Sequence, residues 1–250
     1  NVVGDNNTTT GNNNYVEGGS NSVVGDNNFV DPAFANQVVG SGNSILDNGS
    51  TASVSTNDIN GNENTIEGVG NGDNAIGNQI DGYGNYIVAD TAVANANAID
   101  GGSNVIDSSS GNDVSGNSNL INLQSDSNEV TGNSNTLTSD ADFNTVDGSS
   151  NLVSASDFNA ITGSGNELVS GADGNLVDGS NNSLNASDSN EVVGNSNTLV
   201  NGADNNLVSG SYNSLNASDR NEILGIGNTL QNGADDNAVL GASNSINNSD

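Results

Sequence analysis

An asparagine that returns at a nearly constant interval is the feature that most constrains this chain. The recurring unit is Asn-x-Φ, where Φ is Val, Ile or Leu, and a Gly commonly follows two residues after Φ. From residue 97 onward the steps between leading asparagines alternate 7 with 8 or 9, so two units make a coil of 15 or 16 residues. A disordered chain has no reason to keep such a register. The leading asparagines are Asn97, Asn104, Asn112, Asn119, Asn128, Asn135, Asn144, Asn151, Asn159, Asn166, Asn175, Asn182, Asn190, Asn197, Asn206, Asn213, Asn221, Asn228, Asn237 and Asn244.

The spacing within the unit predicts short strands and excludes a helix. Asn and Φ are two residues apart and therefore point to the same side of a strand, whereas a helix needs apolar spacing near 3.6 and few glycines. Buried amides are costly unless they are paired, but identical Asn side chains stacked at strand spacing can bond one another. We therefore expect an all-β chain: a narrow parallel β-solenoid, or β-roll, with two short strands per coil of 14–16 residues. Positive φ is expected at the corner glycines Gly116, Gly132, Gly163, Gly194 and Gly225.

The register of the repeat differs between two parts of the chain. Residues 1–96 are expected to form irregular N-terminal solenoid coils with loop insertions, and residues 68–96 break the phase of the repeat. Residues 97–250 are expected to form regular coils that alternate 15 with 16 residues, within one continuous domain. The only proline lies within residues 31–34 and predicts an outward loop there, because proline cannot donate to a sheet ladder.

The charge balance limits the partners that this chain can bind. Its 250 residues include 31 Asp or Glu and a single Lys or Arg, which gives a formal net charge of -30. Nucleic acid binding requires Lys and Arg to displace counterions, so it is excluded, and anionic membrane surfaces are disfavoured. No apolar stretch is long enough to span a membrane, so direct membrane insertion is not expected. Cations are the expected partners.

Catalysis finds little support in the composition. The chain has no His and no Cys, which removes the usual general base, the thiol nucleophile and zinc-thiolate sites. Carboxylates are plentiful, but they recur as a repeated column instead of one distinguished pair of the kind that glycosidases use. We therefore expect that the protein is not an enzyme.

Aspartates recur two residues before alternate leading asparagines, in step with the coil. Stacked at strand spacing, such carboxylates repel by roughly 1 kcal/mol per pair even in water. One interpretation is that each Asp accepts hydrogen bonds from turn backbone, with salt screening the repulsion. The other interpretation is that the column binds a row of calcium ions, because calcium takes 6 to 8 oxygen ligands. Calcium is the one cofactor expected. The only basic residue, Arg220, adjoins Asp219 and could neutralise one member. The candidate metal ligands are Asp126, Asp142, Asp157, Asp173, Asp188, Asp204, Asp219, Asp235 and Asp250.

A second set of candidates occupies outward positions on one face. This face is small, polar and nearly uncharged, whereas acids recur on the opposite face. It is either ordinary solenoid surface or a hydroxyl and amide array that orders water or contacts another rod. Its threonines look too scattered for a regular ice-matching grid. The candidate contact or ice-binding residues are Thr136, Thr138, Ser183, Thr198, Ser214, Thr229 and Ser245.

Two families carry similar repeats. The segments Asn21-Ser-Val-Val-Gly25 and Ser189-Asn190-Glu-Val192-Val-Gly194 resemble the xxNxVxG repeat of the ice-recrystallisation-inhibition proteins of cold-tolerant grasses. That resemblance implies a left-handed β-roll with inward Asn and Val, although the acidic outward ladders and the Asp column are not part of the grass pattern. The segment Gly132-Asn-Ser-Asn135-Thr-Leu137 is similar to the GxxSxAxG repeat of trimeric autotransporter adhesin heads. This second resemblance implies a bacterial surface adhesin, with a trimer as one assembly.

These observations lead to two functional expectations. The first is an extracellular or cell-surface structural repeat module of a fibre, surface layer or adhesin, stabilised by calcium if the Asp column binds metal. Its partner would be itself, as a homo-oligomer or filament. Lateral contact is one route, and end-to-end stacking is the other, since neither end of the sequence shows an obvious polar cap. The alternative is an ice-binding or ice-recrystallisation-inhibition protein that uses the Thr/Ser/Asn face.

Overall fold

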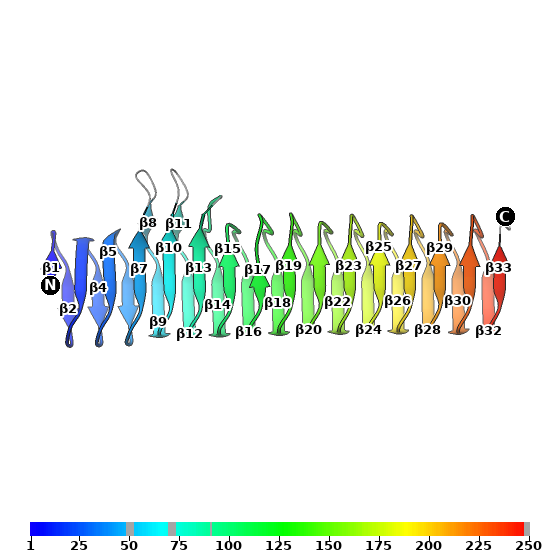
Figure 1. Ribbon diagram of the computed structural model, residues 1–250, viewed down its shortest axis with the longest axis horizontal. Coiled ribbons are helices and arrows are strands. Elements are labelled where there is room, and N and C mark those ends of the chain that lie inside the picture. The colour runs from blue at the N-terminus through cyan, green and yellow to red at the C-terminus, as the bar shows by residue number, and fades with distance from the viewer. Residues whose placement is uncertain (49–52, 70–73, 91, 248–250) are drawn as a thin grey trace. The chain divides into compact units, whose positions relative to one another are not determined.

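The computed structural model describes residues 1–48, 53–69, 74–90 and 92–247. The chain divides into two compact units, unit 1 (Asn1–Val130) and unit 2 (Thr131–Asp250). Each unit is a parallel β-solenoid, and within each unit the strands lie side by side (Figure 1). All regular secondary structure in the described residues is strand, which confirms the expected fold class. None of these residues forms a helix that could cross a membrane. The change from irregular to regular coils expected after residue 96, within one continuous domain, stays a prediction.

The coils contribute strands to two parallel sheets, which we call sheet A and sheet B. In unit 2 each coil contributes one strand to each sheet, whereas some longer coils of unit 1 contribute two strands to sheet A. In unit 1 the strands of sheet A are β1 (Val2–Val3), β3 (Tyr15–Gly19), β5 (Phe29–Phe34), β7 (Ser44–Asp47), β8 (Val54–Ser55), β10 (Thr65–Gly68), β11 (Ala75–Ile76), β13 (Tyr86–Ala89), β15 (Val105–Asp107) and β17 (Leu120–Ile121). Those of sheet B are β2 (Thr8–Thr10), β4 (Ser22–Val24), β6 (Gln37–Val39), β9 (Asp58–Asn62), β12 (Gln79–Tyr83), β14 (Ala98–Gly102) and β16 (Asp113–Asn117). Strand β18 (Glu129–Asn133) contains the boundary between the units.

Unit 2 is the more regular of the two. Its sheet A has three-residue strands: β19 (Thr136–Thr138), β21 (Leu152–Ser154), β23 (Glu167–Val169), β25 (Ser183–Asn185), β27 (Thr198–Val200), β29 (Ser214–Asn216), β31 (Thr229–Gln231) and β33 (Ser245–Asn247). Its sheet B has five-residue strands: β20 (Thr145–Ser149), β22 (Ala160–Ser164), β24 (Leu176–Ser180), β26 (Glu191–Asn195), β28 (Leu207–Ser211), β30 (Glu222–Ile226) and β32 (Ala238–Ala242). Each strand pairs in parallel with the next strand of its own sheet, one coil further along the chain.

The aliphatic residue of each unit is buried, as the spacing predicts. In sheet A of unit 2, Leu184, Leu199 and Leu215 have no exposed area. The matching position of sheet B holds Val or Ile, and these residues are buried too, for example Val177 and Val192 with no exposed area. Full burial of one such side chain contributes roughly 1.5–3 kcal/mol. Because a coil contacts only its neighbours, this contribution repeats along the stack.

The leading asparagines are buried with their hydrogen bonds satisfied. Asn197 shows the pattern: its backbone N–H and its Nδ2 both donate to Oδ1 of Asn182 one coil earlier, at 3.0 Å each. Its Nδ2 also donates to the carbonyl of Gly210 at 3.0 Å. In turn its Oδ1 accepts from the backbone N–H and the Nδ2 of Asn213, at 3.1 and 3.0 Å. Both amide protons and both acceptor sites are thus used, which removes the cost of burying the side chain.

The corner glycines combine a positive φ with close backbone approach. Gly194 has a φ of 132°, and a Cβ added there would lie 1.8 Å from the carbonyl oxygen of Gly210 in the next coil. The same arrangement recurs at Gly163 and Gly225. The positive φ expected at the five corner glycines is confirmed. Only glycine allows the coils to stack at strand spacing at this corner.

Unit 1 keeps the asparagine ladders through longer coils. Asn57 donates to Asn36 and Asn78 donates to Asn57, so successive members are 21 positions apart in the sequence. Asn85 likewise donates to Asn64, so two asparagines within the apparently irregular residues 68–96 are ladder members. The outward loop expected at residues 31–34 is wrong, since these residues belong to β5. The register between β3 and β5 shifts between Val16 and Gly18, and this irregularity accommodates Pro32 in a strand.

Candidate functional site

The aspartate column lies at a corner of unit 2, and its members bond to backbone. Oδ1 of Asp173 accepts from the N–H of Asp157 at 2.8 Å, and Oδ1 of Asp188 accepts from the N–H of Asp173 at 2.9 Å. The same contact continues through Asp204, Asp219 and Asp235. These carboxylates are half-buried. Each therefore joins two successive coils at a turn.

The remaining predicted members of the column differ in how they are placed. Asp126 in unit 1 accepts from the N–H of Ser110 at 2.6 Å. Asp142 donates its N–H to Oδ1 of Asp157 at 2.8 Å. Asp250 lies outside the described residues.

The contacts of the column bear on the two interpretations of it. These contacts agree with the first interpretation, in which each Asp side chain accepts a hydrogen bond from a backbone N–H. The N–H belongs to the neighbouring coil instead of the same turn. Among the described residues, no group of three or more Asp or Glu side chains is arranged to hold a metal ion. Binding of calcium by pairs of these carboxylates stays a prediction.

Arg220 pairs with the next coil. Its Nε and one terminal nitrogen donate to Oδ1 and Oδ2 of Asp236, at 2.7 and 2.8 Å, in a bidentate ion pair. The guanidinium is also 3.8 Å from Oδ2 of Asp235, a member of the column. The hydrogen bonds from Arg220 lower the pKa of Asp236. The side chain adjoining in sequence, Asp219, is not the one that Arg220 contacts most closely.

The predicted contact residues occupy the outward face of sheet A in unit 2. Ser183, Thr198, Ser214, Thr229 and Ser245 are direct partners on five successive strands, so a hydroxyl stands at the same position in each of these five coils. Two residues further along each strand stand Asn185, Val200, Asn216, Gln231 and Asn247. We call these ten residues the hydroxyl-amide face. It carries no charge.

Thr136 and Thr138 lie on β19, apart from that face. Leu152 on β21 and Glu167 on β23 occupy the first outward position between Thr136 and Ser183. The predicted set therefore separates into two threonines and a continuous column of five hydroxyl residues. The scattering of threonine in the sequence hides this column, because Ser and Thr alternate along it.

Sheet B presents a different outward face in unit 2. Acids and apolar residues mix there: Glu191 and Glu222 alternate with Leu176 and Leu207 at the first outward position. Leu224 is 54% exposed and Leu240 is 77% exposed on the same face. The hydroxyl-amide face of sheet A therefore lacks charge, whereas the outward face of sheet B in the same unit carries acids.

Unit 1 contains an aromatic and acidic cluster that the sequence analysis missed. Tyr15 and Phe29 stack on adjacent strands of sheet A, with ring centroids 4.8 Å apart. The Tyr15 hydroxyl donates to Oε2 of Glu17 at 2.6 Å, and this bond raises the pKa of Tyr15 to about 12. Burial and the neighbouring carboxylate of Glu17 raise the pKa of Asp31. Two aromatic residues 14 positions apart, close to one coil length, were the available signal.

A column of small buried residues was also missed. In unit 2 Ala141, Ser156, Ala172, Ser187, Ala203, Ser218 and Ala234 occupy one corner with no exposed area. Ser187 shows their role: its Oγ donates to the Asn185 carbonyl at 3.1 Å and accepts from the N–H of Ala203 at 3.2 Å. The alternation of Ser and Ala satisfies backbone groups at a corner that water does not reach.

These features define the chain as a parallel β-solenoid repeat protein with two internal asparagine ladders. No protein-family model matches the sequence, and a comparison with curated proteins found no match.

Proposed function

We propose that this protein is an extracellular structural repeat module of a fibre, surface layer or adhesin, which makes lateral contacts through the hydroxyl-amide face. The single observation that carries the proposal is the absence of charge across the ten outward residues of five successive strands, in a chain with a net charge of -30. Two such chains repel through any acidic face. Apposition of the uncharged faces brings donors and acceptors together without bringing carboxylates into contact.

Introducing charge on the hydroxyl-amide face tests lateral association. The double variant Thr198→Glu/Thr229→Glu places two carboxylates at outward positions of β27 and β31. The matched control is Thr145→Glu/Thr162→Glu, at exposed outward positions of β20 and β22 in sheet B. We expect concentration-dependent association of the unmodified chain in sedimentation, loss of it in the double variant, and no loss in the control. A chain that stays monomeric at every concentration, or a control that fails equally, contradicts lateral contact through this face.

Ice binding is the second candidate, and the five-strand hydroxyl column favours it. The parallel sheet fixes Ser183, Thr198, Ser214, Thr229 and Ser245 at roughly 4.8 Å from coil to coil. Ice is an uncharged lattice of hydrogen-bond donors and acceptors. A rigid array of hydroxyl groups at constant spacing suits such a surface better than mobile or charged side chains do.

Assays of thermal hysteresis and ice recrystallisation separate the two candidates. If ice is the partner, the unmodified chain is active, and Thr198→Tyr removes most of the activity because the ring lifts the face off the lattice. Thr162→Tyr, on the opposite sheet, keeps the activity. Inactivity of the unmodified chain in both assays rejects ice binding and leaves the structural role.

A further inference from the structure

The residues that directly follow the aspartates form a column of their own in unit 2, which we call the corner column. Its described members are Phe143, Phe158, Gly174, Ser189, Asn205, Arg220 and Asp236, all exposed. All have a φ between 55° and 64°. The N–H of Phe158 donates to the Asp142 carbonyl at 3.0 Å, and that of Gly174 donates to the Asp157 carbonyl at 2.9 Å. The backbone is thus held by its neighbours, and each coil presents one side chain to solvent at a fixed interval.

Two phenylalanines of this column stack in the open. The rings of Phe143 and Phe158 are 5.0 Å apart between centroids and only 4° from parallel. Phe143 is 53% exposed and Phe158 is 64% exposed, so the pair is not part of the core. Rings that solvent surrounds to this extent contribute little to folding. An exposed aromatic stack of this kind is typical of a binding surface.

The next position of the column, residue 174, is a glycine and carries no side chain. Gly174 follows Phe158 by one coil, and a Cβ built there would meet only the Ser189 hydroxyl, at 3.8 Å. Other members of the column adopt the same φ with ordinary side chains, so the conformation does not require glycine at this position. Gly174 therefore leaves a gap beside the second face of the Phe158 ring. One further planar group at the same interval would continue the stack.

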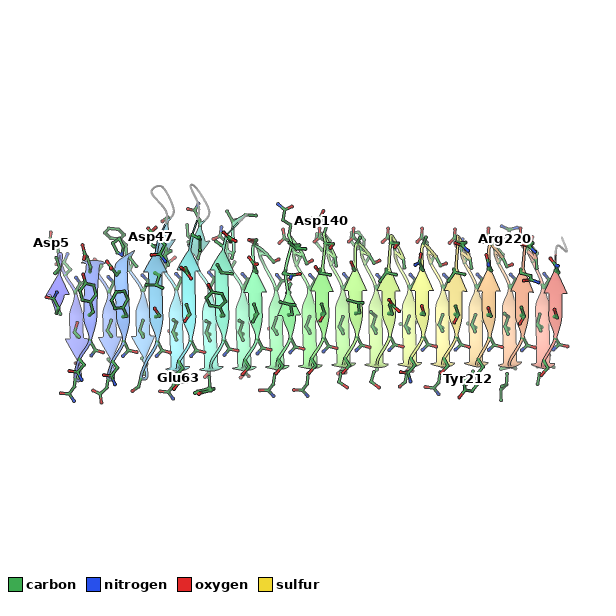
Figure 2. The ribbon with its side chains drawn as sticks, viewed as in Figure 1. Asp5, Asp47, Glu63, Asp140, Tyr212 and Arg220 are labelled. Carbon is green, nitrogen blue, oxygen red and sulfur yellow. The ribbon has the colours of Figure 1, made fainter. Side chains whose placement is uncertain are left out.

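The surroundings of this gap are strongly negative. Asp157 and Asp173 directly precede Phe158 and Gly174, and their recorded bonds to backbone engage Oδ1. Asp140 is exposed three residues before Phe143, and Figure 2 shows it at the same edge of unit 2 as Arg220, with Tyr212 at the opposite edge. Negative charge beside an aromatic face favours a cation over a neutral ring.

One guanidinium already binds along the corner column, that of Arg220. Arg220 belongs to the column, and its side chain lies along it to pair in bidentate fashion with Asp236 one coil later. Arg220 is also the only Lys or Arg of the chain. A second guanidinium on this edge must therefore come from another molecule.

We propose that the gap at Gly174 is a binding site for an arginine side chain of a basic partner segment. The guanidinium stacks on the open face of Phe158, and the carboxylates of Asp157 and Asp173 supply the opposite charge. A planar guanidinium both fills the interval and stacks on the ring, which the compact ammonium of lysine does not do equally well. This site is separate from the hydroxyl-amide face, and neither depends on the other.

Titration calorimetry with two short peptides tests the site. One peptide carries three arginines separated by glycines, and the other carries lysines at the same places. Phe158→Ser removes the ring, with Ser189 as a precedent for serine in the column. Gly174→Asn fills the gap without supplying a new ring, with Asn205 as a precedent for Asn in the column, and Asn205→Ser is the control at another position. We expect the arginine peptide to bind about three- to tenfold more weakly to Phe158→Ser and to Gly174→Asn, with no change for the control.

The salt dependence of binding, and the preference for arginine over lysine, distinguish binding at this site from general attraction to an acidic surface. General attraction falls with salt and acts on both peptides, whereas stacking on Phe158 persists at about 0.15 M salt and favours arginine. Equal binding of both peptides, or an arginine peptide that binds Phe158→Ser as well as the unmodified chain, overturns the proposal. So does an oligosaccharide that binds at Phe158 while the arginine peptide does not. Unchanged melting of Phe158→Ser shows that a loss of binding is not a loss of fold.

Discussion

The backbone N–H of Asp157 donates to the carboxylate Oδ1 of Asp173, one coil later, at 2.8 Å. This contact explains why a strongly acidic chain keeps like charges stacked. Each Asp closes a turn of the preceding coil, and the hydrogen bond is charge-assisted, which makes it stronger than a neutral one. The repulsion between successive carboxylates acts against it and is reduced by salt.

Substitution at Asp173 separates the acceptor from the charge. Asp173→Ala removes the partner of the Asp157 N–H and should lower the free energy of unfolding by about 1–3 kcal/mol. Asp173→Asn keeps an acceptor oxygen and removes one repelling charge, so we expect a smaller loss at low salt. Urea unfolding at two salt concentrations measures both. If Asn costs as much as Ala at every salt concentration, the charge itself stabilises the fold.

Melting with and without calcium tests the metal prediction for the same column. Because stacked carboxylates repel one another, we expect sodium chloride to raise the melting temperature by screening. If the carboxylates accept only backbone N–H groups, calcium adds nothing beyond its ionic strength. A calcium-specific rise that a chelator reverses would show that pairs of these carboxylates hold the ion.

The asparagine ladder should tolerate no apolar substitute. Asn197→Leu removes the Nδ2 bonds to Asn182 and Gly210, and it takes away the Oδ1 that accepts from the buried N–H and Nδ2 of Asn213. We expect a loss of more than about 3 kcal/mol in the free energy of unfolding. The control is Asn195→Ser, because Ser211 occupies the equivalent outward position one coil later. Chemical denaturation of the two variants makes the comparison, and similar losses would contradict the role of the ladder.

Tyr15 should ionise late in an alkaline titration. Its pKa is raised from 10.0 to about 12, first by the hydrogen bond to Glu17. Since the folded pKa lies above the unfolded one, the stability that this hydroxyl contributes is complete below pH 10 and is lost as pH rises through about 12. Tyrosinate absorbance follows the transition, and Tyr15→Phe identifies it. Glu17→Ala should move the transition toward pH 10; an unmoved transition contradicts the assigned cause.

Composition and local pattern alone do not reveal which residues of adjacent coils pair with each other. In unit 1 the ladders pass through coils of 21 residues, so Asn78 and Asn85 join them although the sequence looks out of phase there. Strand pairing in three dimensions restores the register that the spacing loses. The same pairing places Phe143 on Phe158 and Arg220 on Asp236, across 15 and 16 residues of sequence.

The sequence by itself determined the solenoid, the inward asparagines and aliphatic residues, and the corner glycines. These follow from alternation within a few residues and from a conformation that only glycine adopts without strain. The tertiary structure alone decided which side chains of different coils meet. It turned alternating Ser and Thr into one hydroxyl column and set the aspartates on neighbouring backbone amides. It also left a gap beside an exposed ring at Gly174. The physical reason is that such contacts depend on how coils of unequal length come into register, and that register is set by the stacking of the whole coil.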